Sequence, residues 1–174
     1  MRGGRLLFEG LDLALAPGEA ALVTGANGAG KTSLIRIAAG LLRPTAGAAR
    51  TARAALAGDT LALDERLPLG RALDFWARLD GSDARPAMEA FGVSGLAQVP
   101  VRMLSTGQRK RAALARVLGS GARLWLLDEP ASGLDDEGQE QLTEAIAAHR
   151  NGGGAILAAT HQPLALPGAV EVHL

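Results

Sequence analysis

Residues 25–32 read GANGAGKT, a glycine-rich run between a short apolar stretch and a stretch with helical periodicity. The spacing of its glycines, lysine and threonine fits a phosphate-binding loop, or P-loop. Such a loop needs backbone N–H groups that converge on an anion, and glycine permits both the tight turn and the close approach of phosphate oxygens. A glycine-rich connector without a ligand is the alternative, but the expected strand before the run and the helix after it favour the P-loop.

The loop also predicts how a nucleoside triphosphate and its magnesium ion bind. We expect Lys31 to reach the β- and γ-phosphates and Thr32 to coordinate Mg²⁺. The helix that begins near Lys31 adds the positive end of its dipole. The residues expected to bind ATP here are Gly25, Ala26, Asn27, Gly28, Ala29, Gly30, Lys31, Thr32 and Ser33.

Residues 124–129 read LWLLDE, four apolar residues followed by two carboxylates. Buried parallel strands are apolar, and ligands gather at their carboxyl ends. We expect Asp128 to help hold Mg²⁺ and Glu129 to act as the general base that polarises the attacking water. A strand that ends in an acidic turn is common, so the position of this one after a P-loop is what favours a catalytic role.

Two further segments carry polar residues, one at the start of an expected helix and one at the end of an expected strand. Residues 104–108 read LSTGQ and precede a basic helix, whose N-terminus the serine or threonine can cap and at which phosphate can bind. The basic residues that follow are interpreted as a solvated face. His161 follows an expected strand and lies where a sensor of the γ-phosphate would be placed, although a lone histidine there is usually structural. We assign no role to His149 and His173.

Strand and helix patterns alternate along the chain, which predicts an α/β fold with a mainly parallel sheet around a RecA-like P-loop core. Strands are expected over residues 6–15, 20–24, 124–127 and 155–160, and helices over 31–39, 71–79, 84–91, 107–118 and 136–150. Residues 43–58 are alanine-rich and ambiguous. We expect a single domain over 1–174, with a core of about residues 1–66 and 119–174 and a helical subdomain of about 67–118.

In the helix expected over residues 71–79, Leu73, Trp76 and Leu79 share helical spacing. We therefore expect Trp76 to belong to the core. Phe75 lies about 100° away around the helix and is expected to be exposed, as a contact for a membrane partner.

The composition sets limits on the function. The chain has 174 residues, as many basic as acidic residues and no cysteine, so nothing indicates a nucleic-acid partner, a disulfide or a thiolate metal site. No apolar run approaches the roughly 18 residues that span a bilayer, and residues 1–5 lack the apolar core of a secretory signal. We expect a cytosolic chain that reaches a membrane only through a partner.

The P-loop, the LSTGQ pentad, the acidic strand end and the late histidine follow the order of ABC ATPases, and the chain resembles that family over nearly its whole length. In that family, two cassettes close head to tail as a homodimer. The resemblance implies that Ser105, Gly107 and Gln108 of one subunit contact the ATP held by Lys31 of the other. It also places Asp135 at the dimer interface.

A closer resemblance is to the ATPase of the haem exporter in cytochrome c maturation. It rests on the segments VTGANGAGKTSLIRIAAGLLRPTAG, LPLGRALDFWARL, LSTGQRKRAALARVL, LWLLDEPASGLD and ATHQPL. That family is bacterial and works at the cytoplasmic face of the inner membrane with integral membrane partner subunits. No residue here reads as a haem ligand, so the haem link rests on resemblance alone. A soluble ABC ATPase of iron–sulfur assembly and an ABC transporter of another substrate are the alternatives, whereas a P-loop kinase would not need the pentad.

The sequence departs from the ABC pattern at two places. ABC ATPases usually carry a glutamine between core and helical subdomain, but residues 57–61 read AGDTL, and we expect Asp59 or Thr60 to take its place. Family members also have a strand and an adenine-stacking aromatic before the segment 6–8, which this sequence does not include. Either the start codon is misassigned or this strand is absent. We expect Phe8 to pack inward and, if translation starts at Met1, ATP binding to be weaker and less selective for the base.

Overall fold

The computed structural model describes residues 6–58 and 60–174. A five-stranded sheet lies at its centre in the order β2-β3-β4-β1-β5, and every neighbouring pair is parallel. The strands are β1 (Ala20–Thr24), β2 (Ala54–Ala57), β3 (Leu124–Asp128), β4 (Ala155–Ala159) and β5 (Val170–His173). The prediction of an α/β fold with a mainly parallel sheet is confirmed.

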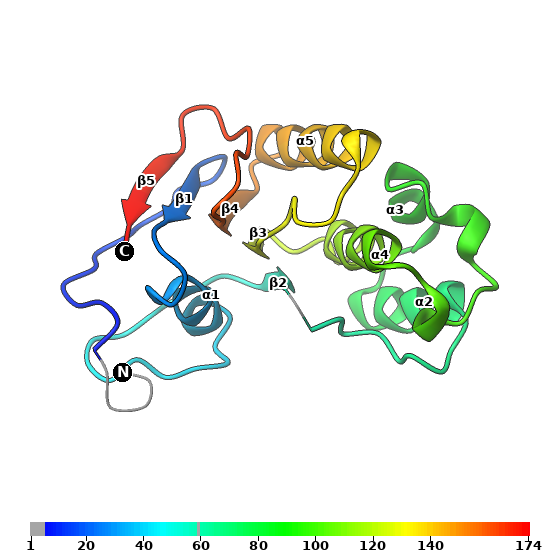
Figure 1. Cartoon of the computed structure of the whole chain (residues 1–174), viewed down its shortest axis with the longest axis horizontal. Helices are drawn as coiled ribbons and strands as arrows, with labels where there is room; N and C mark the ends of the chain where they lie inside the picture. Colours follow the sequence, from blue (N-terminus) through cyan, green and yellow to red (C-terminus); the bar gives the residue numbers. More distant parts are fainter. Residues whose placement is uncertain (1–5, 59) are drawn as a thin grey trace.

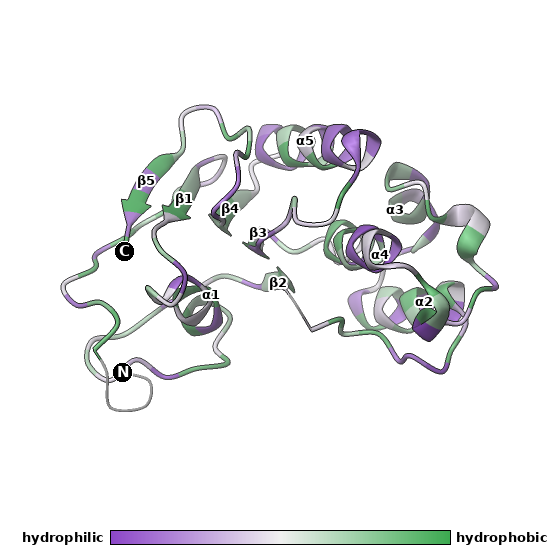
Figure 2. Ribbon diagram, viewed as in Figure 1, coloured by the Kyte–Doolittle hydropathy of each residue, from purple (hydrophilic) through white to green (hydrophobic). Residues whose placement is uncertain are grey.

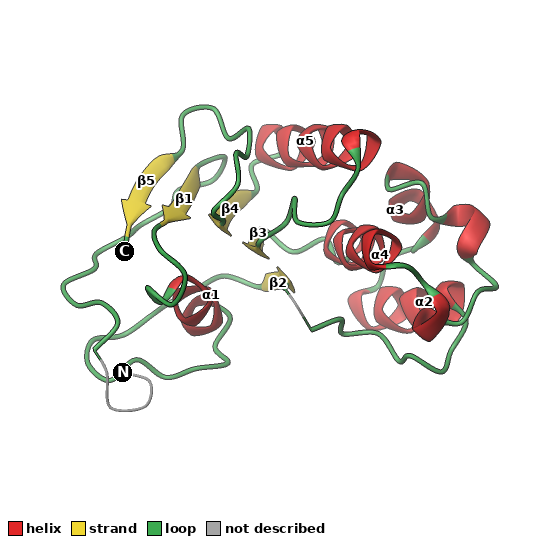
Figure 3. Cartoon of the chain, in the orientation of Figure 1, coloured by secondary structure: helices red, strands yellow, loops and turns green. Residues whose placement is uncertain are grey.

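Helices cover both faces of this sheet (Figures 1 and 3). They are α1 (Lys31–Ala38), α2 (Leu69–Asp80), α3 (Arg85–Ala90), α4 (Thr106–Gly119) and α5 (Asp136–Asn151), with short 3-10 helices at Ser94–Leu96 and Val101–Met103. Helix α1 packs on one face, and α4 and α5 pack on the other. Helices α2 and α3 lie beyond α4, away from the strands (Figure 1). Figure 2 shows hydrophobic residues along the strands and hydrophilic residues on the outer turns of α5.

The alternation of side chains along β3 decides which face each one enters. Trp125 and Leu127 belong to the larger core cluster with α4 and α5, whereas Leu126 belongs to the smaller cluster with α1. Asp128 follows Leu126 by two residues and therefore faces the side of α1. In agreement, Asp128 and Ile35 of α1 line the same pocket. The carboxylate thus lies on the same face of the sheet as the helix that follows the P-loop.

One strand prediction is wrong, and two strands of the sheet were not predicted. Residues 6–15 form no strand. The leucines of this segment, at positions 11, 13 and 15, instead pack against the smaller core cluster, so burial of an irregular segment accounts for their alternation. The strand β2 lies inside the alanine-rich stretch that was ambiguous, and β5 was not predicted. Both are only four residues long, too short to show a period.

Helix α2 confirms one expectation and corrects another. Phe75 is 56% exposed, as predicted. Trp76 packs against the core, and its Nε1 donates to the carbonyl of Ala62 at 2.6 Å. Leu79, however, is 65% exposed and does not share the buried stripe of Leu73. Six residues along a helix rotate by about 600°, which is about 120° short of two full turns, so the two leucines point about 120° apart.

Candidate nucleotide-binding and catalytic site

Three neighbouring strands end at the same edge of the sheet, and each carries part of the site. The P-loop follows β1, His161 lies just past the end of β4, and Asp128 with Glu129 lie at the end of β3. In the strand register, Ala159 is the partner of both Val23 and Asp128. The P-loop strand and the carboxylate strand are therefore two strand spacings apart, about 10 Å. The sheet brings together the P-loop, the carboxylates and the histidine that the sequence singled out.

Lys31 is the first residue of α1, and its ammonium lies inside the P-loop. The residue is 7% exposed, and its Nζ donates to the carbonyl oxygens of Gly25 at 2.8 Å and Ala26 at 3.2 Å. An ammonium has three donors, so a phosphate oxygen can accept from the third. The first N–H groups of α1 have no intrahelical acceptor and add to the same positive site.

The path of the P-loop depends on glycines at two positions. Gly30 has a φ of +121°, and a Cβ there would lie 2.9 Å from the ring of Phe8, which is half-buried as expected. Gly25 has a φ of +136°, and a Cβ there would lie 2.4 Å from the carbonyl oxygen of Leu174. Neither position can hold a side chain without a rearrangement. The tip of the loop is exposed and comprises Ala26, Asn27 and Gly28, while Ala29 is half-buried.

The predicted metal ligands lie on the α1 side of the sheet. Asp128 is buried, Thr32 is half-buried in the first turn of α1, and Ser33 is buried next to it. No group of three or more His, Cys, Asp or Glu that could hold a metal occurs in the part of the chain that the structure describes. A hydroxyl and a single carboxylate nevertheless suit Mg²⁺, which binds through one or two carboxylates together with substrate phosphates.

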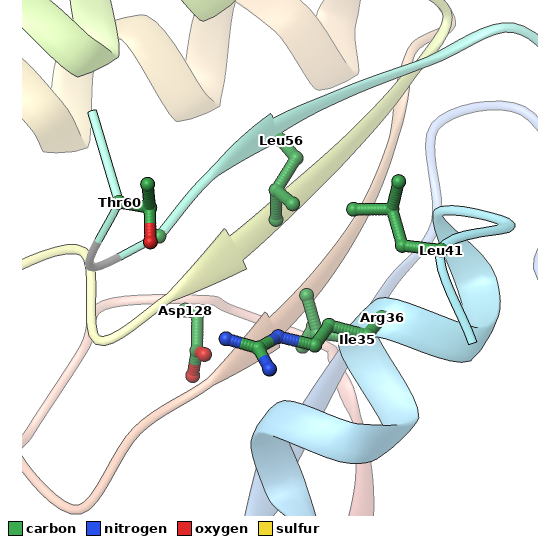
Figure 4. A pocket seen from close by; sticks show the side chains of 7 residues that line it. Ile35, Arg36, Leu41, Leu56, Thr60 and Asp128 are labelled. Atoms are coloured by element: carbon green, nitrogen blue, oxygen red, sulfur yellow. The ribbon is translucent and has the colours of Figure 1, made fainter. Parts of the chain in front are cut away.

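A pocket of about 270 Å³ lies beside Asp128 (Figure 4). Its lining consists of Ile35, Arg36, Leu41, Leu56, Gly58, Thr60 and Asp128. Figure 4 shows the guanidinium of Arg36 and the carboxylate of Asp128 directed toward each other across this space. Thr60, one of the two expected replacements for the family glutamine, thus shares a pocket with Asp128, while Asp59 lies outside the described residues.

Glu129 is held in one orientation by the end of β4. Its Oε1 lies 2.8 Å from His161 Nδ1, and its Oε2 accepts from Thr160 Oγ1 at 3.0 Å and from the N–H of His161 at 3.3 Å. Burial acts to raise the pKa of Glu129, but the hydrogen bonds from His161 and Thr160 outweigh it and keep the pKa below the usual value. The carboxylate is therefore ionised and able to accept a proton.

The backbone at Glu129 is unusual as well. Its φ of 49° makes it the one described residue other than glycine with a positive φ. Such a conformation is costly for an L-residue, and it is typical of functional sites. Sequence reasoning missed Thr160, which is buried at the end of an apolar strand and fixes Glu129. A hydroxyl at the end of an apolar strand is a signal that could have found it.

The LSTGQ pentad forms the N-terminus of α4. Ser105 is the N-cap, and its hydroxyl accepts from the backbone of Gln108 at 3.2 Å, while Gln108 Oε1 accepts from the backbone of Ser105 at 3.0 Å. This reciprocal pair is a capping box. Gly107 packs so close to the next loop that a Cβ would lie 2.9 Å from the carbonyl oxygen of Gly133. The pentad thus has the capping role that the sequence allowed.

Asp135 caps the next helix, α5, by accepting from the N–H of Gly138 at 3.0 Å. Its carboxylate is also paired with Arg111 of α4, and the hydrogen bond from this guanidinium holds the pKa of Asp135 below the usual value. In the described part of the chain, no hydrogen bond or ion pair joins Ser105 or Asp135 to the P-loop. Within one chain, Ser105 and Asp135 therefore belong to a surface that makes no polar contact with the P-loop of the same chain.

Comparison with known families defines the class. Residues 8–132 match the family model described as ABC transporter. This match spans more than half of the chain, and the chain belongs to the ABC transporter family as one of its ATP-binding proteins. No helix in the described part of the chain is long and apolar enough to cross a membrane.

Individual relatives narrow the class further. The cytochrome c biogenesis ATP-binding export protein CcmA of Sphingopyxis alaskensis is 56% identical over 176 residues, which cover 99% of this chain and 91% of the relative. The protein of the same name from Novosphingobium aromaticivorans is 58% identical over 166 residues, covering 95% and 86%. Among solved structures, an ATP-binding subunit of an ABC transporter is similar with a TM-score of 0.78 and 25% identity, over 85% of this chain and 70% of that one.

Proposed function

We propose that the chain is the ATP-hydrolysing subunit of a CcmA-type exporter in cytochrome c biogenesis. The observation that carries this proposal is the identity of 56% and 58% to two export proteins of that name, over nearly the whole chain. The site agrees with it, because a P-loop, a carboxylate pair and a histidine meet at one edge of the sheet.

Binding of the triphosphate is the first step. Lys31 donates to the carbonyls of Gly25 and Ala26 and can offer its third N–H to the β- and γ-phosphates, and the first turn of α1 supplies further N–H donors. Thr32 and Asp128 would hold Mg²⁺, which would offset the negative charge of the phosphates. Thr60 lies in the same pocket as Asp128, so we assign it the place of the missing glutamine.

Hydrolysis is the second step. Glu129 accepts a proton from the water that attacks the γ-phosphate, and it can do so at neutral pH because its carboxylate is ionised. Thr160 and His161 fix the carboxylate through three contacts, so the base is already oriented when ATP binds. His161 lies at the exposed side of Glu129, where it can also contact the γ-phosphate.

The ATP-bound form is a homodimer. The capped N-terminus of α4 offers Ser105, Gly107 and Gln108 with the positive end of a helix, which is an anion-binding feature. We propose that this group, with Asp135, closes on the ATP held by the P-loop of a second copy. Two ATP molecules would then lie between the two chains.

The site of action follows from the export function. We place the chain at the cytoplasmic face of the bacterial inner membrane, bound to integral membrane subunits, with haem as the exported group on the strength of the family resemblance. The segment of about residues 67–118 is proposed as the helical subdomain. It carries Phe75, whose exposed ring is a candidate contact for these subunits.

The test is isolation of the complex from detergent-solubilised membranes through a tag on this chain. The expected result is recovery of integral membrane proteins together with ATP hydrolysis, which the Lys31→Ala variant loses while it still recovers the same partners. If the tagged chain hydrolyses ATP but never recovers a membrane protein, the exporter assignment is wrong and a soluble ABC ATPase of cofactor assembly is favoured.

A further inference from the structure

The N-terminal turn of α4 and the loop of residues 132–135 lie against each other. A Cβ on Gly107 would lie 2.9 Å from the carbonyl oxygen of Gly133, and a Cβ on Gly133 would lie 3.6 Å from Thr106 Cγ2. At 2.9 Å, the backbone itself would have to move to admit a side chain at position 107. The turn and the loop therefore form one packed surface.

Arg111, in the next turns of α4, joins the same loop to the start of α5. Its guanidinium donates to Asp135 Oδ1 and lies 3.6 Å from Glu137 Oε2. Asp135 Oδ1 also accepts from the backbone N–H of Gly138, as the cap of α5. One carboxylate oxygen thus holds both the guanidinium from α4 and the first turn of α5.

The side chain of Arg111 passes between two glycines. A Cβ on Gly92, at the end of α3, would lie 3.2 Å from Arg111 Nη1, and a Cβ on Gly138 would lie 3.2 Å from Arg111 Nε. The arginine side chain is 12% exposed, whereas that of Asp135 is 68% exposed. Backbone therefore shields the guanidinium, while its partner stays open to solvent. Ion pairs with an exposed partner add little to stability, so this geometry acts mainly on the orientation of the loop.

We propose that Arg111 is a positioning residue, which holds residues 132–135 against the N-terminal turn of α4 so that Ser105, Gly107 and Asp135 meet a second copy of the chain as one surface. This inference rests on the proposed ATP-dependent homodimer. Since Arg111 acts through the loop, its loss weakens closure of the dimer and leaves nucleotide binding to the P-loop of the same chain unchanged.

The experiment follows dimer formation by sedimentation over an ATP titration. All chains carry Glu129→Gln, which is expected to prevent hydrolysis and keep the dimer closed. Arg111→Gln should raise the ATP concentration at half-dimerisation about tenfold, as expected for loss of a charge-assisted hydrogen bond. Asp135→Asn keeps the helix cap, because asparagine caps as well as aspartate, but it weakens the ion pair and should give a similar shift. The double variant should shift no further than Asp135→Asn alone, since both substitutions remove the ion pair between Arg111 and Asp135.

Two controls separate positioning from a general structural effect. Arg85→Gln removes the exposed ion pair with Asp83, which also lies in the segment of about residues 67–118. This variant should leave the ATP concentration at half-dimerisation unchanged. ADP affinity of each monomer should stay the same, because ADP occupies only the P-loop of its own chain. If Arg111→Gln is unfolded at the assay temperature, Arg111→Lys keeps the charge without the fork that reaches two carboxylates, and it should show a smaller shift in the same direction.

Each outcome decides the question. The proposal is wrong if the Arg111 variants dimerise at the same ATP concentration as the parent, if ADP affinity falls in parallel, or if the Arg111 and Asp135 effects add. If the Glu129→Gln parent stays monomeric at all ATP concentrations, the homodimer is wrong and the role of Arg111 falls with it. A parent that dimerises normally while Arg111 has no effect leaves the proposed function intact and overturns this inference alone.

Discussion

Replacing Glu129 with glutamine tests the catalytic assignment most directly. The amide keeps the shape of the side chain, and its oxygen can still accept from Thr160 Oγ1 and from the N–H of His161, the two partners of Oε2. Its NH₂ group then faces His161 Nδ1, which can accept when the ring is neutral. The local structure therefore survives, while the group that takes the proton from water is lost.

The expected size of the effect follows from the role of a general base. Such a group contributes about 10²–10⁴-fold to a rate, so kcat should fall by that factor, about 3–5 kcal/mol in activation free energy. Affinity for ATP should change less than about threefold, because none of the three contacts of Glu129 involves the P-loop. In this variant, kcat should therefore fall while the affinity for ATP stays nearly constant.

The variant should also change the pH dependence of stability. Because the pKa of Glu129 lies below its usual value in the folded chain, its carboxylate stabilises the fold fully above the usual pKa of glutamate. This contribution is lost as pH falls through the lowered pKa. The difference in melting temperature between wild type and Glu129→Gln should therefore shrink as the solution is acidified below the usual pKa of glutamate.

The assay is phosphate release at saturating ATP and Mg²⁺, together with ATP titration and thermal melting of the same preparations. Glu144→Gln is the matched control, since this glutamate is exposed on α5. It should behave as wild type in all three measurements. A kcat within about tenfold of wild type for Glu129→Gln would refute the assignment of Glu129 as general base.

Three further changes have defined outcomes. Lys31→Ala should abolish hydrolysis and weaken ATP binding about tenfold or more, because a charged donor to two phosphates is lost; wild-type turnover would contradict the P-loop assignment. Phe75→Ser should reduce recovery of membrane partners more than it lowers the melting temperature, since the ring is exposed, and a large drop in melting temperature would show a core role instead. Burial lowers the pKa of His149, so the fold should lose stability as pH falls from about 7.5 to about 5.5, and His149→Gln, which cannot become charged, should lose less over the same range in thermal melts.

Much of the site could be predicted from the sequence because its parts have local signatures. The P-loop combines glycine, lysine and threonine at a spacing that few other structures need, and the carboxylates follow an apolar strand of ordinary length. Which of these motifs lie next to each other in the fold depends instead on the strand order, in which β4 lies between β1 and β3. The place of His161 after a strand could be predicted, but its contact with Glu129 depends on the strand order, which no sequence pattern encodes.

The misses have physical causes as well. Alternating leucines in residues 6–15 looked like a strand, but burial against the smaller core cluster produces the same period in an irregular segment. The edge strand β2 consists of alanine and leucine, which carry no strong strand preference. Arg111 was interpreted as part of a solvated face because charge runs usually are. Its burial depends on Gly92, in the turn after α3, and on Gly138 of α5.

The proposed site consists of two separate parts, the P-loop with the strand ends and the turn of α4 with the loop of residues 132–135. The P-loop, Glu129 and His161 converge at the ends of β1, β3 and β4, so one chain can bind and orient the nucleotide by itself. The capped turn of α4 and the loop of residues 132–135 pack against each other, with no polar contact from Ser105 or Asp135 to the P-loop in the described part of the chain. Under the proposed function, a chain built in this way binds ATP alone and completes the site with a second copy. We propose that ATP binding drives closure of this dimer and that hydrolysis, with Glu129 as the base, releases it, which is a cycle that suits an exporter.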